Sequence, residues 1–182
     1  MKKEIKESKF FIDFVRVTGV IPAFFWKRPK VCYYKEKPEY MTKGGVLIAS
    51  NHITFTDPIT LYSVFWKRRL RFFVTKDLYK NELLTALLKM VGCIQVDKEN
   101  FSMNSLRSAV EKLKTGNALL IFPEGQVNSS EDTLSYKSGA VFMSNLSGAP
   151  ILPVHIAHEK GRIMYHNIAV VGEPIDIKAM SS

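Results

Sequence analysis

The sequence predicts a single α/β domain with a mostly parallel central sheet flanked by helices. Two observations predict this fold. Short apolar runs typical of strands alternate with helix-like segments from residue 45 to residue 171, which is the pattern of a parallel sheet whose strands are joined by helices. The chain has 182 residues, 46% of them hydrophobic, which is enough for one complete core and too few for two comfortable ones.

The first five expected elements are bounded by capping and turn residues. Asp57 is expected to cap a helix that begins at Pro58, because a carboxylate accepts bonds from free N–H groups and proline fits the first helical position. The next helix carries its leucines at helical spacing. In order, we expect a strand over 45–49, a helix over 58–66, a strand over 70–74, a helix over 78–90 and a strand over 93–96.

The second half continues the alternation. The run over 118–122 is apolar throughout, as expected of a strand that is buried on both faces of the sheet. Gly116 is expected to end the helix before it, because glycine tolerates the left-handed backbone found at helix ends. The expected elements are a helix over 102–114, a strand over 118–122, a helix over 139–146 and strands over 151–156, 163–165 and 168–171.

Positive charge is concentrated near the beginning of the chain. Residues 1–80 contain 17 Lys and Arg against 7 Asp and Glu, so they hold all of the formal net charge of +9. Aromatic residues are interleaved with these cations, a mixture that suits an anionic membrane surface. Single-stranded nucleic acid is a second interpretation, and a basic cytosolic enzyme with an aromatic core is a third.

The longest apolar tract covers residues 10–26. Asp13, Arg16 and Pro22 interrupt it, which argues against a simple membrane-spanning helix. Asp13 and Arg16 would share one face of a helix and could pair there. We expect an interfacial or re-entrant helical anchor, and an amphipathic helix packed on the domain's own core is the alternative.

The expected organisation follows from this tract. Residues 1–40 are assigned as a basic and apolar membrane-anchoring segment, and residues 41–182 as the α/β domain. Two cysteines cannot form a disulfide framework and no cleavable signal sequence is apparent, which favours a reducing compartment. The expected location is the cytoplasmic face of a membrane, with peripheral or monotopic attachment.

Polar residues follow two of the expected strands, where open α/β sheets bind ligands. His52 comes just after the first strand, and Asp57 stands five positions further on, across a turn. The carboxylate could fold back to orient the imidazole as a general base, with a substrate hydroxyl as the nucleophile. The alternative is a plain helix cap at Asp57 beside a surface histidine.

The second polar segment is Phe122-Pro-Glu-Gly125, after the most apolar strand. Gly125 allows a ligand to approach the backbone closely, and Glu124 can accept hydrogen bonds from substrate hydroxyls. By itself this segment is also compatible with a turn that carries a solvated glutamate.

Together these segments resemble the glycerolipid acyltransferase family, which includes the lysophosphatidate acyltransferases. The resemblance covers residues 44–176, with every block in the family's order. The matching blocks are Asn51-His52-x4-Asp57, Gly92-Cys-Ile-Gln-Val-Asp97-Lys98, Phe122-Pro-Glu-Gly125, Tyr136-Lys137-Ser-Gly139, Ala149-Pro-Ile-Leu-Pro153-Val and Gly172-Glu-Pro-Ile175.

The resemblance implies an O-acyltransferase of phospholipid biosynthesis. Its reaction would move an acyl group from acyl-CoA or acyl carrier protein to a hydroxyl of a lysophospholipid-like acceptor such as 1-acyl-glycerol-3-phosphate. His52 would remove the hydroxyl proton and Asp57 would orient His52, without an acyl-enzyme. The substrate-binding residues implied at matching positions are Asn51, Lys98, Glu124, Gly125 and Lys137.

The chain departs from the family pattern at two positions. The family commonly continues Pro-Glu-Gly-Thr-Arg-Ser, and here Val127 stands in place of the arginine, which contacts acceptor phosphate in the family. Lys98 stands where the family often has arginine, and lysine keeps the charge without the bidentate fork. The phosphate site is therefore expected to be altered, and the acceptor could be a different lipid or an amino-lipid.

No cofactor is expected beyond the acyl donor, which is a substrate. His155 and His158 are poorly spaced for joint metal binding on a strand, so no metal site is expected. The expected partners are a membrane lipid surface, the lipid acceptor and an acyl carrier protein as one of two donors, with no nucleic acid. A non-catalytic lipid-binding module is the alternative outside enzyme classes.

Overall fold

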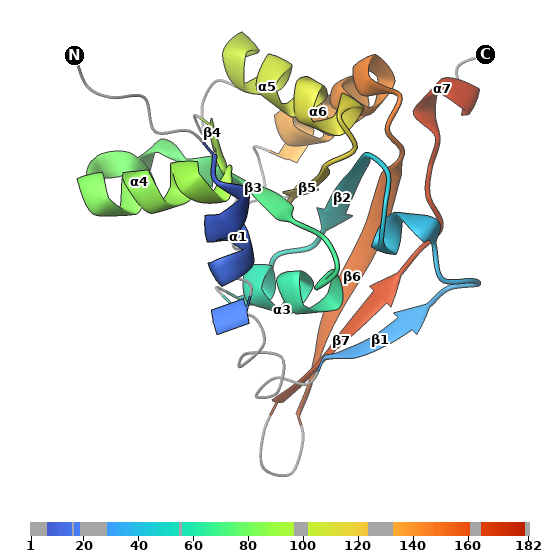
Figure 1. Cartoon of the computed structure of the whole chain (residues 1–182). Helices are drawn as coiled ribbons and strands as arrows, with labels where there is room; N and C mark the ends of the chain where they lie inside the picture. Colours follow the sequence, from blue (N-terminus) through green and yellow to red (C-terminus); the bar gives the residue numbers. More distant parts are fainter. Residues whose placement is uncertain are drawn as a thin grey trace.

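The computed structural model describes residues 7–15, 17–18, 29–54, 56–96, 102–123, 133–160 and 165–180. Its strands form a seven-stranded sheet in the order β1-β7-β6-β2-β5-β3-β4. Neighbouring strands are parallel except β6 and β7, which are antiparallel. The prediction of an α/β domain with a mostly parallel sheet flanked by helices is confirmed (Figure 1).

The elements follow the expected alternation. The strands are β1 (Lys30–Tyr33), β2 (Val46–Ser50), β3 (Leu70–Thr75), β4 (Ile94–Val96), β5 (Ala118–Ile121), β6 (Ile151–Lys160) and β7 (Tyr165–Val171). The α-helices are α1 (Lys9–Val15), α3 (Asp57–Val64), α4 (Glu82–Val91), α5 (Met103–Lys114), α6 (Thr133–Ser147) and α7 (Ile177–Met180). Two 3-10 helices are η2 (Glu39–Met41) and η3 (Lys76–Lys80).

Several boundaries differ from the sequence prediction. The helix expected over 78–90 is divided into η3 and α4, because Asn81 takes an extended backbone and its side chain accepts from Leu84 N at 3.1 Å, which caps α4. Strand β7 begins at Tyr165 and includes the strand expected over 168–171, whereas residues 163 and 164 of the strand expected over 163–165 lie outside the described residues. Helix α6 begins at Thr133, earlier than the expected 139.

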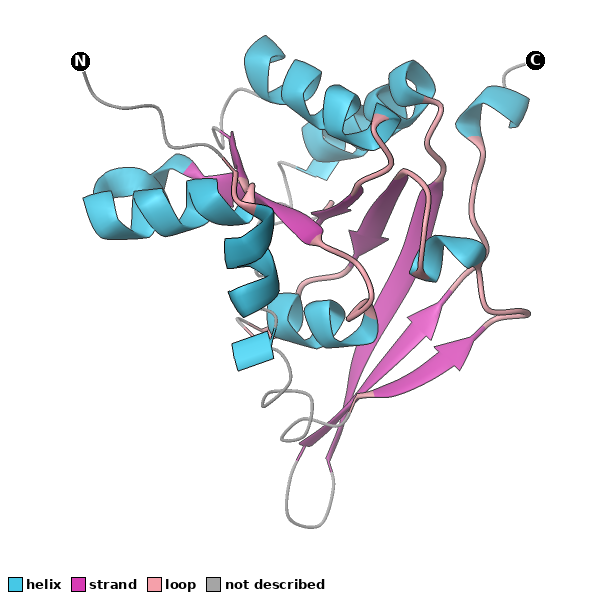
Figure 2. Ribbon diagram, in the orientation of Figure 1, coloured by secondary structure: helices cyan, strands magenta, loops and turns pink. Residues whose placement is uncertain are grey.

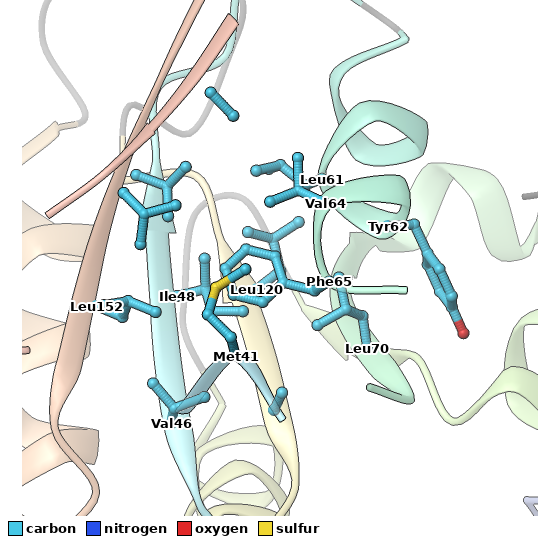
Figure 3. Packing of buried hydrophobic residues seen from close by; sticks show 14 of the residues in the cluster. Met41, Val46, Ile48, Leu61, Tyr62, Val64, Phe65, Leu70, Leu120 and Leu152 are labelled. Atoms are coloured by element: carbon cyan, nitrogen blue, oxygen red, sulfur yellow. The ribbon is translucent and has the colours of Figure 1, made fainter. Parts of the chain in front are cut away.

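Alternating residues of β2 build two cores, one on each face of the sheet. Val46 and Ile48 pack in a cluster with residues of α3, including Leu61. Figure 3 shows Leu61 directed at the strands. Leu47 points the other way, into a cluster with Leu113 of α5 and with α6. Helix α3 therefore covers one face, and α5 and α6 cover the other (Figure 2).

The expected N-terminal helical anchor is not found among the residues that the structure describes. Within 10–26, the structure describes the seven-residue helix α1 and residues 17–18, whereas residues 16 and 19–28 lie outside the described residues. Ile12 is fully buried, and α1 contacts α4, as the alternative of a helix packed on the domain predicted. No helix in the described ranges is long and apolar enough to cross a bilayer.

Asp13, which is expected to pair with Arg16, makes an ion pair with the folded domain. It pairs with Arg69 at 2.6 Å, just before β3. Arg16 lies outside the described residues. This contact ties α1 to the sheet.

The sheet begins before the expected boundary at residue 40. Strand β1 lies in the segment assigned to anchoring, yet it pairs with β7 from Lys30 to Tyr33. Val31 and Tyr33 pack against the core on the α3 face of the sheet. The strand is difficult to recognise in the sequence, because it has only four residues and basic residues flank it on both sides.

Candidate active site

The site lies at the carboxyl ends of β2 and β5. These strands are parallel neighbours, with Ala49 opposite Ile121. The chain leaves β2 for α3 on one face of the sheet and leaves β5 for α6 on the other face. Open α/β sheets bind ligands beyond the strand ends at which the connections diverge in this way.

His52 and Asp57 meet beyond the carboxyl end of β2. The Nδ1 atom of His52 lies 3.2 Å from Oδ2 of Asp57. Asp57 is the first residue of α3 and Thr56 occupies the cap position, one residue earlier than expected. The carboxylate of Asp57 therefore does not cap the helix and instead turns back toward the loop that carries His52.

The carboxylate of Asp57 is fully buried and fixed by four donors. Oδ2 accepts the N–H groups of Ile53 and Thr54, each at 2.7 Å, and Oδ1 accepts the Thr54 hydroxyl at 2.8 Å. Burial alone would raise the pKa of Asp57, but the hydrogen bonds from Thr54, Ile53 and His52 outweigh it, and the pKa lies below its ordinary value. Asp57 is thus ionised at neutral pH and accepts the Nδ1 proton of His52.

Phe122 packs against one face of the His52 imidazole. Its ring stacks on that of His52 with centroids 4.2 Å apart and 21° between the ring planes. The His52 side chain is 18% exposed, and within the described part of the chain Nε2 has no hydrogen-bond partner. A tautomer that donates Nδ1–H to Asp57 leaves the lone pair on Nε2, which is the atom that a general base uses.

Asn51 links the histidine loop to β6. Its Nδ2 donates to the carbonyl of Ile156 at 2.9 Å, and its Oδ1 accepts the N–H of Ile156 at 2.7 Å. The side-chain amide therefore pairs with β6 as another strand residue would. These bonds hold the loop that carries His52 against β6, and substrate binding by Asn51 stays a prediction.

A further buried pair was not identified from the sequence. Asn167 of β7 donates to the hydroxyl of Thr60 in α3 at 2.6 Å, and both residues are fully buried. The pair fixes the helix that carries Asp57 against β7. The one signal in the sequence was Asn167, a polar residue before an apolar run. Its partner Thr60 is 107 positions away and could not be inferred from the sequence.

A family model described as Acyltransferase matches residues 31–157, which include β1 to β5 and the site. The chain belongs to the acyltransferase family. It is similar to the "Probable 1-acyl-sn-glycerol-3-phosphate acyltransferase" of Mycoplasma genitalium, with 30% identity over 84% of this chain and 58% of that protein. It is also 29% identical to the 1-acyl-sn-glycerol-3-phosphate acyltransferase of Bacillus subtilis, over 72% of this chain and 67% of that one.

The fold also matches a solved acyltransferase structure. The crystal structure of the 1-acyl-sn-glycerophosphate acyltransferase PlsC from Thermotoga maritima aligns with a TM-score of 0.66 and 24% identity. The alignment covers 96% of this chain and 72% of that one. The chain thus spans roughly three fifths to three quarters of the length of these relatives.

For this member of the acyltransferase family, the structure brings together only part of the expected site. Asn51, His52 and Asp57 lie within one loop and the start of α3. Lys98, Glu124 and Gly125 lie outside the described residues. Lys137 belongs to α6, and its side chain lies outside the described part of the structure.

Thiol chemistry has little support in this acyltransferase domain. Burial raises the pKa of Cys93 to about 11, so its thiol stays protonated at neutral pH. In the described ranges, no group of three or more His, Cys, Asp and Glu side chains is close enough together to hold a metal ion.

Proposed function

We propose that the protein transfers an acyl group from an acyl thioester to the free hydroxyl of lysophosphatidate, 1-acyl-glycerol-3-phosphate. The observation that carries this proposal is the His52 imidazole, held at Nδ1 by an ionised and buried Asp57. The names of the bacterial relatives support the acceptor. Both acyl-CoA and acyl carrier protein are candidate donors.

In the proposed reaction, Nε2 of His52 removes the proton from the acceptor hydroxyl as its oxygen attacks the thioester carbonyl. The new ester C–O bond forms, the C–S bond breaks, and the leaving thiolate takes the proton back from the imidazolium. Asp57 stabilises the imidazolium while it exists. General-base action of this kind contributes roughly 10²–10⁴ in rate.

Acceptor binding is proposed at the segments that follow β4 and β5. Glu124 and Gly125 would hold the glycerol portion, and Lys98 and Lys137 would contact its phosphate. Support for this assignment comes from the motif positions in the sequence. Val127 favours a second acceptor class, a lipid or amino-lipid without a phosphate monoester, because valine cannot bind an anion.

The test is acyl transfer by the purified chain to a panel of acceptors, with acyl-CoA and acyl carrier protein supplied as separate donors. His52→Ala should abolish transfer and leave the circular dichroism spectrum and thermal unfolding unchanged. Wild-type turnover in a folded His52→Ala protein would defeat the mechanism. Binding of lysophospholipid without turnover in the parent protein would favour a non-catalytic lipid-binding module.

We also propose peripheral attachment to the cytoplasmic face of a membrane. Phe10 and Phe14 on α1 are exposed, Phe10 by 82% of its surface, and Trp66 is exposed after α3. Aromatic side chains beside cations favour the headgroup region of a bilayer. Liposome flotation tests this: Phe10→Ser/Phe14→Ser should float less than the parent.

The matched control for flotation is Tyr34→Ser/Met180→Ser, which removes two exposed large side chains elsewhere. Point variants are preferable to truncation, because deletion of α1 would also remove the buried Ile12. Equal flotation of both double variants would place the attachment on another surface.

A further inference from the structure

A basic hollow lies at the amino ends of β2, β3 and β5, on the edge of the sheet opposite His52. It encloses about 480 Å³ between the turns that precede these strands. Its described lining contains no acidic side chain. The cationic lining residues are Lys9, Lys43, Lys67, Arg68, Arg69 and Arg71.

Arg68 is the most unusual of these cations, because it is only 5% exposed. Its guanidinium donates to the carbonyls of Tyr40 at 3.0 Å and Gly116 at 3.1 Å, and also to that of Gly44. These carbonyls satisfy the N–H groups without neutralising the charge, and no described carboxylate pairs with Arg68. Burial and the nearby charge of Arg71 lower the pKa of Arg68, so an anion in the hollow would relieve both penalties.

The remaining cations divide into two groups. Lys9 and Lys67 have no carboxylate partner in the described chain, and the Lys67 ammonium lies 5.5 Å from the centre of the Trp66 ring. Nε of Arg71 is buried without an acceptor among the described atoms. Each of the other three cations has a carboxylate partner: Lys43 pairs with Glu39, Arg69 with Asp13 and Arg71 with Glu7.

We propose that this hollow binds a phosphate group. Lys9, Lys67 and Arg68 line a polar concavity, and none of them has a carboxylate partner among the described residues. Ammonium and guanidinium groups are the side chains that bind phosphate most strongly. A membrane headgroup and a soluble phosphate ester are the two sources of such a group. The exposed Phe10 and Trp66, each adjacent in sequence to one of the two lysines, favour the headgroup.

This phosphate is distinct from that of the proposed acceptor. The hollow lies at the first residue of β2 and His52 lies beyond its last, so about 16 Å of strand separates them. A glycerol phosphate is too short to reach both. The inference therefore does not rest on acyl transfer.

The experiment compares Lys9→Gln/Lys67→Gln with the matched control Lys30→Gln/Lys35→Gln, which removes two exposed lysine charges near β1. Arg68 is left unchanged, because its substitution would remove the hydrogen-bond donor of three backbone carbonyls. Lys9 and Lys67 make no such bond among the described residues. Inorganic phosphate binding is measured by calorimetry at constant ionic strength. Co-sedimentation uses phosphatidylcholine vesicles with either phosphatidic acid or an equal surface charge of oleic acid.

We expect the test variant to bind phosphate about tenfold more weakly than the control in at least one of the two assays. If the test variant binds more weakly only in the calorimetric assay, the ligand of the hollow is a soluble phosphate ester. If it binds more weakly only to phosphatidic acid vesicles, the ligand is a lipid headgroup. Loss in both assays supports a site that accepts either source. Equal binding by the two double variants in both assays, or an equal loss on the oleic acid vesicles, would overturn the proposal.

Discussion

The imidazole of His52 is held between the carboxylate of Asp57 and the ring of Phe122. Asp57 fixes Nδ1 from the edge, at 3.2 Å, and Phe122 stacks on the face at 4.2 Å between centroids. The two supports come from different strand ends, β2 and β5. The direction of Nε2 is therefore determined by how these two strands pair.

We predict that Phe122→Leu lowers kcat by about tenfold to a hundredfold, because a small displacement of a catalytic base is costly. Leucine retains most of the packing volume and loses the flat stacking surface. Phe122→Tyr is the control, since it keeps the ring and should retain most of the activity. Steady-state kinetics measure both, and equal kcat values for the leucine variant and the parent would show that stacking does not position His52.

Asp57→Asn should reduce kcat/KM by about 10³-fold or more, because a neutral amide cannot stabilise the imidazolium and favours the wrong tautomer. The N–H groups of Ile53 and Thr54 also lose a charged acceptor. Thr54→Val is the matched control, since it removes one hydroxyl donor to Asp57 and leaves the charge. A folded Asp57→Asn protein with the kcat/KM of the control would exclude Asp57 from the reaction.

Acid should destabilise the protein through Asp57. Because the folded-state pKa lies below the ordinary value, the unfolded state takes up its proton first as the pH falls. The stabilisation is present above about pH 4, the unfolded-state pKa, and is lost as the pH falls through the folded-state pKa. Urea unfolding across this range should show a shallower decline for Asp57→Asn than for the parent. Parallel curves would contradict the assignment.

The central sheet and the contact between His52 and Asp57 could be predicted from the sequence, because both have local signals. Apolar runs bounded by turn residues mark β2 and β5, and the spacing of His52 and Asp57 spans a single turn. Strand β1 could not be found in this way. Its pairing with β7 joins segments far apart in the chain, and the basic residues around it resemble a solvated linker.

The roles of Asn51 and Phe122 depend on tertiary contacts that no local pattern contains. Asn51 lies in a motif whose resemblance implies substrate binding, yet its amide is occupied by the backbone of Ile156. Phe122 belongs to a recognised block, but its proximity to His52 follows from the adjacency of β2 and β5.

Asn51→Ala should therefore lower kcat and leave the acceptor KM within about threefold, because it loosens the His52 loop without removing a substrate contact. The unfolding free energy should fall by about 1–3 kcal/mol, since the polar groups of Ile156 lose their partners. The split between kcat and KM is the measurement. A large rise in acceptor KM at unchanged kcat would restore the substrate-binding role expected from the sequence.

Val127→Arg should alter acceptor preference. The family's arginine at this position provides a charge-assisted grip on phosphate, which is worth about 1.5–3 kcal/mol, or roughly tenfold or more in KM. Valine provides none of it, and Lys98 supplies a point charge without the fork. The substitution should lower KM for phosphate-bearing acceptors and leave KM for uncharged ones unchanged.

The comparison requires one acyl donor and the same acceptor panel for the parent and the Val127→Arg protein. Lys98→Ala and Lys137→Ala complete the set, because each removes one cation proposed to contact the acceptor phosphate. If lysophosphatidate binding depends on these lysines, either variant should raise the KM for lysophosphatidate and leave the KM for uncharged acceptors unchanged. A parent protein that strongly prefers lysophosphatidate, with neither lysine variant weakening that preference, would mean that other residues bind the phosphate and that Val127 does not limit the acceptor.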